Sequence, residues 1–212
     1  MRQYDALIFD FDGVLIESVD VKTKAFADLY SGYGPEIVDK VVAFHLSHGG
    51  VSRFQKFRYF HREYLGAELT TEEEAEFGRR FSELVESAVV EVPWVEGAAE
   101  LVQSLYRTIS MFVASGTPED ELLRIVERRG MQRYFVSVHG SPATKAEIID
   151  HIVGSHRFQR RRVLMVGDSL TDYEGAIEAG VPFIGRVPSA IESLFPSHVP
   201  TVRDLRGLLR LI

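Results

Sequence analysis

The chain has 212 residues, which is enough for one large domain or for one domain that carries an insertion. With 24 Lys and Arg against 31 Asp and Glu, its formal net charge is −7, which argues against broad binding to nucleic acid or to anionic membranes. Because the chain contains no cysteine, disulfides, thiolate catalysis and cysteine-based zinc sites are excluded, and a cytoplasmic location is compatible with this composition.

The N-terminus does not resemble a signal peptide, because its apolar run is short and meets two aspartates. No apolar stretch approaches the roughly 18 residues that a membrane-spanning helix needs. We therefore expect neither a membrane partner nor a nucleic-acid partner.

The first predicted element is a buried strand within residues 1–16, because Leu7–Phe9 is apolar without polar alternation. Asp10 and Asp12 follow it, and side chains two residues apart on a strand project to the same side. Gly13 then permits a sharp turn. Two mutually repelling carboxylates are tolerated there when a cation or a reacting phosphoryl group uses them. A pair of turn-forming aspartates is the alternative.

Residues 17–92 contain no convincing strand, and we expect them to form four helices. Apolar residues recur there at intervals of three and four, as on the buried face of a helix. Pro35 is expected to open the second helix. Thr71 and Glu74 are expected to form a capping box at the start of the fourth.

From Pro93 onward the pattern changes to alternating helices and strands. The expected helices are 97–107, 118–129, 145–154 and 171–179, and the expected strands are 109–114, 135–138, 163–166 and 182–184, with two short helices at the end. The predicted caps are Thr117, Thr144 with Glu147, and Thr171 with Glu174. Such alternation is typical of a parallel sheet with crossover helices.

The predicted fold is therefore an α/β core domain of residues 1–16 and 93–212. A helical domain of residues 17–92 is inserted after its first strand. In such a sheet the carboxyl ends of the strands lie at one edge, and ligands bind outside that edge.

Polar residues follow two further strands at this predicted edge. Ser115, Gly116 and Thr117 lead into a helix N-terminus, where hydroxyls and free backbone N–H groups can hold phosphate. Lys145 occupies the first turn of another helix, where a positive charge is unfavourable. We interpret its position as a sign that an anion lies nearby, with a solvated surface lysine as the alternative.

The next strand leads into Gly167–Asp172, which brings two more carboxylates, Asp168 and Asp172, to the same edge. Carboxylates and substrate phosphate oxygens are ligands that Mg²⁺ prefers. An aspartate can attack phosphorus to form an aspartyl-phosphate, and a second can protonate the leaving oxygen and later activate water. A lysine can offset the crowded negative charge.

In order and spacing, these residues resemble the motifs of the haloacid dehalogenase superfamily. Asp10-Phe11-Asp12-Gly13-Val14-Leu15 resembles the first motif, Ser115 within Val-Ala-Ser-Gly-Thr-Pro the second, Lys145 the third, and Gly167–Asp172 with its continuation to Gly180 the fourth. The resemblance implies a Rossmann-like parallel sheet with helices on both faces. The inserted helices resemble the cap of phosphoglycolate phosphatases and beta-phosphoglucomutase.

The resemblance also implies a role for each matched residue. Asp10 would be the nucleophile and a metal ligand. Asp12 would be the general acid and base, with its backbone carbonyl on the metal. Ser115 and the Gly116 amide would bind the phosphoryl oxygens, and Lys145 would pair with Asp10 and the phosphate.

The implied cofactor is Mg²⁺, with Asp168 as a ligand and Asp172 as a supporting residue or a ligand through water. An acid at Asp12 points to phosphate esters, because dehalogenases and phosphonate-cleaving members lack it. Val14 stands where Thr is commoner, which we treat as neutral for the chemistry. The stretch before Lys145 lacks the Lys-Pro dipeptide of many phosphoglycolate phosphatases, which weakens an assignment to phosphoglycolate.

We therefore expect a Mg²⁺-dependent phosphatase that hydrolyses a small phosphorylated metabolite through an aspartyl-phosphate, as a monomer or a homodimer. A sugar phosphomutase of the beta-phosphoglucomutase type shares the core residues and stays open. A phospho-receiver domain is disfavoured, because receivers are shorter and lack the helical insertion. A catalytically silent binding protein is disfavoured, because all four motifs keep competent side chains.

Substrate choice is expected to reside in residues 17–92, because the core contacts only the phosphate. His48 precedes a Gly-Gly loop between two helices, and Arg53 and Lys56 follow it. We expect this loop to lie over the site and these side chains to contact the leaving group, with a solvated surface turn as the alternative. A cationic loop fits either a second negative charge or a sugar phosphate.

Overall fold

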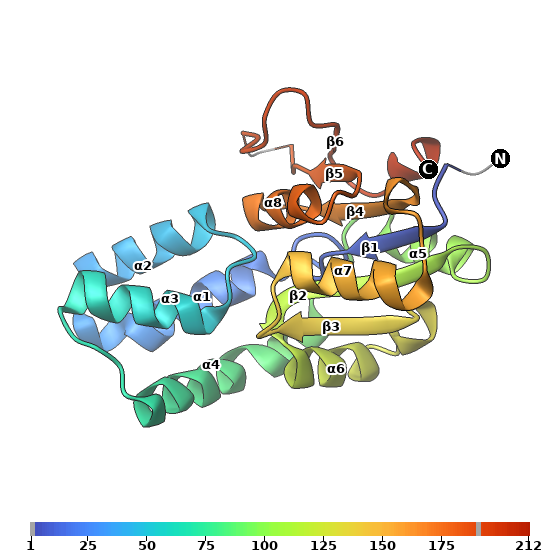
Figure 1. Cartoon of the computed structure of the whole chain (residues 1–212). Helices are drawn as coiled ribbons and strands as arrows, with labels where there is room; N and C mark the ends of the chain where they lie inside the picture. Colours follow the sequence, from blue (N-terminus) through green and yellow to red (C-terminus); the bar gives the residue numbers. More distant parts are fainter. Residues whose placement is uncertain (1–2, 190–191) are drawn as a thin grey trace.

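Six parallel strands form one sheet in the computed structural model, which describes residues 3–189 and 192–212. The order is β3-β2-β1-β4-β5-β6, so the first strand of the chain lies inside the sheet, between β2 and β4 (Figure 1). The strands are β1 Ala6–Phe9, β2 Ser110–Pro118, β3 Ser137–Ser141, β4 Val163–Gly167, β5 Phe183–Arg186 and β6 Thr201–Val202. The predicted parallel α/β sheet is confirmed.

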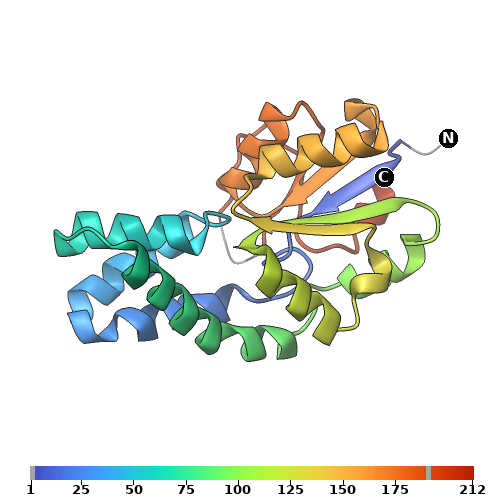
Figure 2. The ribbon, with the colours of Figure 1, turned by 60° about the horizontal axis from the view of Figure 1, so that its bottom comes forward.

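Helices cover both faces of the sheet, which explains why β1 is apolar throughout (Figure 2). The helices of the core are α5 Ala98–Leu105, α6 Glu119–Arg128, α7 Lys145–His156 and α8 Leu170–Glu178. Ala6 and Ile8 pack with α7 and α8, whereas Leu7 and Phe9 pack with α5 and α6. Successive residues of one strand thus belong to two separate hydrophobic clusters.

Between β1 and β2 the chain forms a helical layer beside the carboxyl edge of the sheet (Figures 1 and 2). Its helices are α1 Val19–Tyr30, α2 Pro35–Ser47, α3 Arg53–Phe60 and α4 Thr71–Glu91, and a π-helical turn, His61–Leu65, follows α3. Its centre is aromatic, with Phe26, Phe57, Phe60 and Phe81 fully buried. In the described part of the chain, no helix is both long and apolar enough to cross a bilayer.

The chain leaves the core and returns to it on two adjacent segments. Ile16 forms an antiparallel bridge with Trp94, and the N–H of Glu17 donates to the carbonyl of Pro93 over 3.0 Å. The connections at the two ends of the helical layer are therefore hydrogen-bonded to each other.

Two predicted capping boxes are misplaced. The box of α4 is Thr70 with Glu73, not Thr71 with Glu74. Both threonines offer a hydroxyl, but a capping residue needs an extended backbone, and Thr70 has it with ψ at 163°. Pro35 does open α2, as predicted.

The box of α8 is Ser169 with Asp172, not Thr171 with Glu174. Ser169 has the extended backbone, with ψ at 161°, so the helix begins before Thr171. The Thr171 hydroxyl instead donates to the carbonyl of Gly49 in the helical layer, over 2.9 Å.

The predicted cap at Thr117 is also wrong. Strand β2 continues through Pro118, the residue before α6, and among the described residues no side chain accepts a capping hydrogen bond from that helix. The Thr117 hydroxyl instead donates to Asp12. The capping box of Thr144 and Glu147 at α7 is present as predicted.

The end of the chain differs from the two expected helices. Its described residues, 187–189 and 192–212, contain the two-residue strand β6 and the 3₁₀ turn Leu208–Arg210. A strand of two residues carries too little alternation to be recognised, and β6 exists because Gly185 and Val187 donate to the carbonyls of Pro200 and Val202.

Candidate active site

The carboxyl ends of β1, β2 and β4 meet in a cavity of about 550 Å³ that the helical layer covers. This volume is typical of pockets that take small molecules. From the sheet edge the cavity is lined by Asp10, Asp12, Gly116, Thr117, Asp168 and Ser169. Side chains of the helical layer line it from the opposite side, including Lys22, His45, Arg53 and Lys56.

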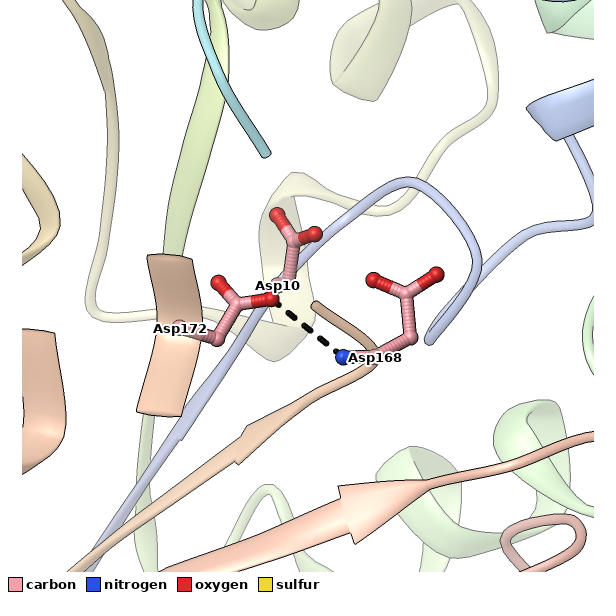
Figure 3. Close-up of side chains that lie close together, drawn as sticks. All are labelled: Asp10, Asp168 and Asp172. Carbon is pink, nitrogen blue, oxygen red and sulfur yellow. Dashed lines mark hydrogen bonds between the residues drawn. The ribbon is translucent and has the colours of Figure 1, made fainter. Parts of the chain in front are cut away.

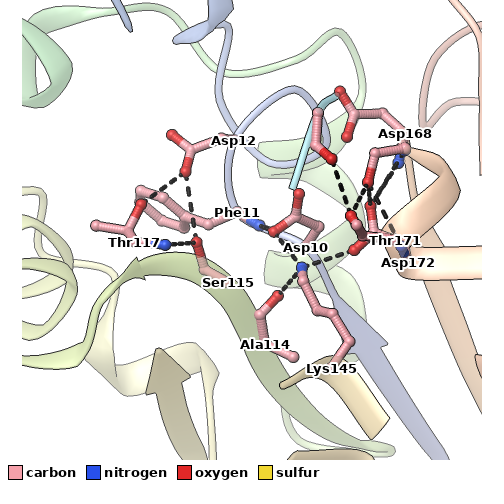
Figure 4. Close-up of polar contacts among 12 residues, drawn as sticks. Asp10, Phe11, Asp12, Ala114, Ser115, Thr117, Lys145, Asp168, Thr171 and Asp172 are labelled. Atoms are coloured by element: carbon pink, nitrogen blue, oxygen red, sulfur yellow. Dashed lines mark hydrogen bonds and ion pairs between the residues drawn. The ribbon is translucent and has the colours of Figure 1, made fainter. Parts of the chain in front are cut away.

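Lys145 links two of the predicted aspartates. Its Nζ lies 2.7 Å from Asp10 Oδ1 and 2.6 Å from Asp172 Oδ1, and it donates to the carbonyl of Ala114 over 2.6 Å (Figure 4). All three charged groups are buried. Burial would lower the pKa of Lys145, but the charges of both aspartates outweigh it and raise the pKa. The lysine therefore stays protonated at a helix start because anions surround it.

Three carboxylates, those of Asp10, Asp168 and Asp172, gather within 4.8 Å of one another (Figure 3). Burial raises the pKa of Asp10 to about 7, against the charge of Lys145, and neighbouring carboxylates add to the rise. The pKa of Asp168 is raised by burial and by the charges of Asp10 and Asp172. Crowded, buried oxygen donors of this kind fit a divalent cation such as Mg²⁺.

Asp172 differs from the other two, because both of its oxygens contact groups of the chain. One oxygen pairs with Lys145, and the other accepts from the Ser169 hydroxyl at 2.7 Å and from the backbone N–H groups of Ser169 and Asp168 (Figure 4). The Asp172 carboxylate therefore fixes the loop that presents Asp168.

The carboxylate of Asp12 lies apart from this cluster. It accepts from Thr117 at 2.9 Å and from Ser115 at 3.4 Å (Figure 4). It also accepts from Ser18 at 2.5 Å and pairs with Lys22. Burial acts to raise its pKa, but the Lys22 charge and the hydrogen bonds outweigh it and lower the pKa to about 2. The side chain of Asp12 thus lies outside the carboxylate cluster, and the expectation that its backbone carbonyl holds the metal stays a prediction.

Lys22 is a site residue that the sequence analysis missed. It lies in the first turn of α1, pairs with Asp12 and donates to Thr117 over 2.8 Å. The signal that drew attention to Lys145, a lysine close to a helix N-terminus, was present here as well.

Ser115 and Gly116, the expected phosphate residues, lie beside Asp12. The Ser115 hydroxyl is buried, accepting from the N–H of Thr117 at 3.1 Å and donating to Asp12. Gly116 lines the cavity, and a Cβ built on it would lie 2.4 Å from the carbonyl oxygen of Gly50. The loop of the helical layer thus reaches the backbone of the sheet edge.

His48 does not face the cavity. It is exposed, and its ring stacks on Phe44 with a centroid distance of 3.7 Å. The two glycines that follow, Gly49 and Gly50, do line the cavity. The loop therefore lies over the site, but the histidine before it points elsewhere.

Arg53 and Lys56 both line the cavity and are buried. The guanidinium of Arg53 forms a bidentate pair with Glu121 on α6, at 2.8 and 2.5 Å. Lys56 Nζ lies 2.9 Å from His45 Nδ1. Arg53 thus joins the helical layer to the core, whereas Lys56 remains within the layer.

A family model described as haloacid dehalogenase-like hydrolase matches residues 7–186. Solved structures of similar fold cover nearly the whole chain. They include the putative hydrolase YfnB of Bacillus subtilis bound to magnesium (TM-score 0.74, 17% identity, 99% of each chain) and a predicted phosphoglycolate phosphatase of Haemophilus somnus (0.75, 19%, 100% of this chain and 99% of that one). Another is CbbY of Rhodobacter sphaeroides with phosphate (0.76, 17%, 97% and 96%). At these identities the similarity concerns the fold alone.

One curated relative is similar over part of its length. A 5′-nucleotidase of Pseudomonas aeruginosa is 30% identical over 96 residues, which are 42% of this chain and 43% of that protein. The similarity therefore spans less than half of either protein.

Proposed function

This chain belongs to the haloacid dehalogenase-like hydrolases, and from this premise we propose that it is a phosphatase acting on a small-molecule phosphate monoester. The observation that carries the proposal is the buried Asp10–Lys145 pair beside Asp168 and Asp172, in a cavity large enough for a metabolite. The partial similarity to a 5′-nucleotidase supports the same class of reaction.

Asp10 is the proposed nucleophile. Its carboxylate forms a bond to phosphorus while the bond between phosphorus and the leaving oxygen breaks. Lys145 and the backbone N–H of Gly116 would offset the charge on the phosphoryl oxygens. Lys145 also holds Asp10, through the 2.7 Å contact, in one orientation for the attack.

Asp12 and Lys22 are proposed to move the protons. With Lys22 beside it, Asp12 is ionised, so it is ready to take a proton from the water that hydrolyses the aspartyl-phosphate. In the first step the leaving oxygen needs a proton. Since Asp12 is ionised, we assign the acid role to the pair: the Lys22 ammonium gives a proton through Asp12 to the leaving oxygen, and the proton that Asp12 later takes from water returns to Lys22.

The residues present fit Mg²⁺ as the cofactor. Asp10, Asp168 and the backbone carbonyl of Asp12 would hold it, and Asp172 would keep the Asp168 loop in place. When bound, the ion would offset the negative charge of the carboxylates and of the phosphoryl group.

The test is a phosphate-release screen over a panel of phosphorylated metabolites, with Mg²⁺ and with a chelator. Asp10→Asn should lower release at least about 1,000-fold, because an amide cannot form the acyl-phosphate bond. Asp5→Asn, at the opposite end of β1 and paired with Arg162 at the surface, is the matched control and should keep its activity. Activity that survives in Asp10→Asn or in chelator contradicts the proposal. An isomerised sugar phosphate without free phosphate would indicate the mutase instead.

A further inference from the structure

Cationic side chains are not all neutralised in the cavity. Four of them line it, and three form ion pairs with carboxylates of the chain. The pairs are Lys22 with Asp12, Arg53 with Glu121, and Arg186 with Glu17. Lys56 is the fourth, and no carboxylate within residues 3–189 or 192–212 pairs with it.

Lys56 is nevertheless almost completely buried, with 2% of its surface exposed. Its Nζ lies 2.9 Å from His45 Nδ1 and 3.4 Å from the His45 carbonyl, and 5.6 Å from the centre of the Phe26 ring. Burial lowers the pKa of Lys56 to about 7; the charge of Lys22 adds to the effect, and the charge of Asp12, which is paired with Lys22, opposes it. A buried ammonium without a counter-charge is costly, so this site lacks an anion from the chain itself.

His45 adds a second donor without a partner. An ammonium can only donate, so when Lys56 is charged the neutral ring accepts on Nδ1 and carries its proton on Nε2. Burial and the charge of Lys56 lower the pKa of His45 to about 3, so the ring stays neutral. Nε2 is buried, and no described residue accepts its hydrogen bond. A buried donor left unsatisfied is unusual in a folded protein.

We propose that Lys56 and His45 bind a second anionic group of the substrate, a carboxylate or a further phosphate, on the part of the molecule that leaves with the ester oxygen. The inference rests on the proposed phosphatase function. Both residues line the same cavity as Asp10, but from the helical layer. Asp10 and Lys145 would hold the reacting phosphoryl group at the sheet edge, and the leaving group would extend toward Lys56.

The test compares three alkyl phosphates that differ at the far end. Propyl phosphate ends in a methyl group, 3-phosphooxypropanoate in a carboxylate, and 1,3-propanediol bisphosphate in a second phosphate. Analogous series with two and four carbons vary the distance between the ester phosphate and the far end. Wild-type kcat/KM should be at least about tenfold higher for one anionic member than for the methyl member, since a charged hydrogen bond is worth 1.5–3 kcal/mol. The carboxylate and phosphate arms identify which anion is bound.

Lys56→Met keeps the length of the side chain and removes its charge. It should reduce that preference to less than about threefold, because the lost charged hydrogen bond favours only the anionic member. Lys40→Met, on the exposed surface of α2, is the matched control and should keep the wild-type preference. Lys56→Arg should retain part of the preference, which separates lost charge from damaged packing.

Direct binding keeps this inference separate from the proposed function. Calorimetry compares propane-1,3-bisphosphonate with propylphosphonate on the wild type and on Lys56→Met. Hydrolysis of propyl phosphate without any preference for an anionic member overturns the Lys56 site and leaves the phosphatase standing. Bisphosphonate binding that depends on Lys56, without hydrolysis of any ester, retains the anion site and overturns the phosphatase.

Discussion

Two lysines in different surroundings leave neighbouring aspartates with pKa values shifted in opposite directions. Asp10 shares Lys145 with Asp172 and lies near Asp168, so burial and crowding raise its pKa to about 7. Asp12 has Lys22 to itself and accepts further hydrogen bonds, so its pKa is lowered to about 2 despite burial. Environments that separate the pKa values of two acids allow one site to give two carboxylates different roles.

Replacing Lys22 by Met should raise the pKa of Asp12 from about 2 to above its ordinary value of about 3.9. The reason is that burial, which raises the pKa, remains, whereas the largest opposing charge is lost. Carboxyl carbon NMR titration would measure the change. Lys24→Met, on the exposed face of the same helix, is the control and should leave the pKa of Asp12 as it is. An unshifted Asp12 in Lys22→Met would contradict this electrostatic account.

At the scale of single residues, the sequence predicts the convergence of site residues better than their contacts. Asp10 and Asp168 directly follow β1 and β4, and Lys145 begins the helix after β3, so all three lie at the carboxyl edge of one parallel sheet. Lys22 was missed and His48 was misjudged because the direction of a helical side chain depends on how the helix packs. His48 follows the last residue of α2 but turns back onto Phe44.

At the scale of elements, a few strong contacts join the helical layer to the core. Arg53 of α3 pairs with Glu121 of α6, and Ser82 of α4 donates to the same carboxylate at 2.5 Å. Arg129, just beyond α6, donates to the carbonyls of Val89, Val90 and Val92 at the end of α4. Polar contacts thus join both α3 and α4 to helix α6 or to the residue just beyond it.

Arg53→Met should destabilise the fold by about 3–5 kcal/mol, because it leaves the buried carboxylate of Glu121 without its partner. Urea unfolding would measure the loss. The double variant Arg53→Met with Glu121→Leu should recover most of it, since both charges are then removed. Arg79→Met, which breaks exposed pairs on α4, should cost no more than about 0.5 kcal/mol. Equal losses in the two single variants would argue against an anchoring role.

The pair of Arg53 and Glu121 also makes the stability of the fold depend on pH. Burial acts to raise the pKa of Glu121, but Arg53 and Ser82 outweigh it and lower the pKa. An acid with a lowered pKa contributes stability that is present above its unfolded pKa, about 4.3, and is lost as the pH falls through the folded value. The stability gap between wild type and Arg53→Met should therefore shrink below about pH 4.

Elements with clear periodicity are those the sequence predicts well. The strand at residues 6–9 and the helices of residues 17–92 follow from apolar spacing. Cap positions do not, because neighbouring hydroxyls such as Thr70 and Thr71 are equally suited until the backbone conformation decides between them. The short strand β6 depends on its pairing with β5, which no local pattern reveals.

At the scale of the whole molecule, the loop at Gly49 and Gly50 packs the helical layer against the edge of the sheet. Gly50 has a φ of +72°, and a Cβ built on it would lie 1.9 Å from Thr171 Oγ1. Gly49 accepts a hydrogen bond from the same threonine. The loop thus packs by its backbone, and the cavity is closed at this place by main chain rather than by side chains.

Gly50→Ala should loosen this contact, because the added methyl group collides with Thr171. Hydrogen exchange in residues 46–52 should rise by at least about tenfold, the response to a loss of roughly 1.4 kcal/mol of local stability. Gly34→Ala is a matched control, since Gly34 has a φ of +92° but open space around it. It introduces the strain of the backbone without the collision. An equal rise in hydrogen exchange around the substituted residue in both variants would mean that backbone strain alone explains the effect.

Magnesium should stabilise the folded protein, since it would bind carboxylates that meet only after folding. At a concentration 100 times the dissociation constant, the gain is about 2.7 kcal/mol, visible as a higher melting temperature. Asp168→Asn should reduce this gain strongly, whereas Asp150→Asn, in an exposed pair with Arg160, should preserve it. An unchanged melting temperature at saturating Mg²⁺ would argue against the site.

The inner position of β1 has a consequence for how the chain is made. A ribosome synthesises this strand well before its two neighbours, which begin at Ser110 and Val163. At roughly 5–20 residues per second, β1 waits on the order of 5–20 s for its first partner. During that interval its Ala-Leu-Ile-Phe segment has no sheet to join, which makes the nascent chain a candidate client for a chaperone that shields short apolar segments. Strains depleted of such a chaperone should therefore accumulate this protein as aggregates of newly made chains, while molecules folded beforehand stay unaffected.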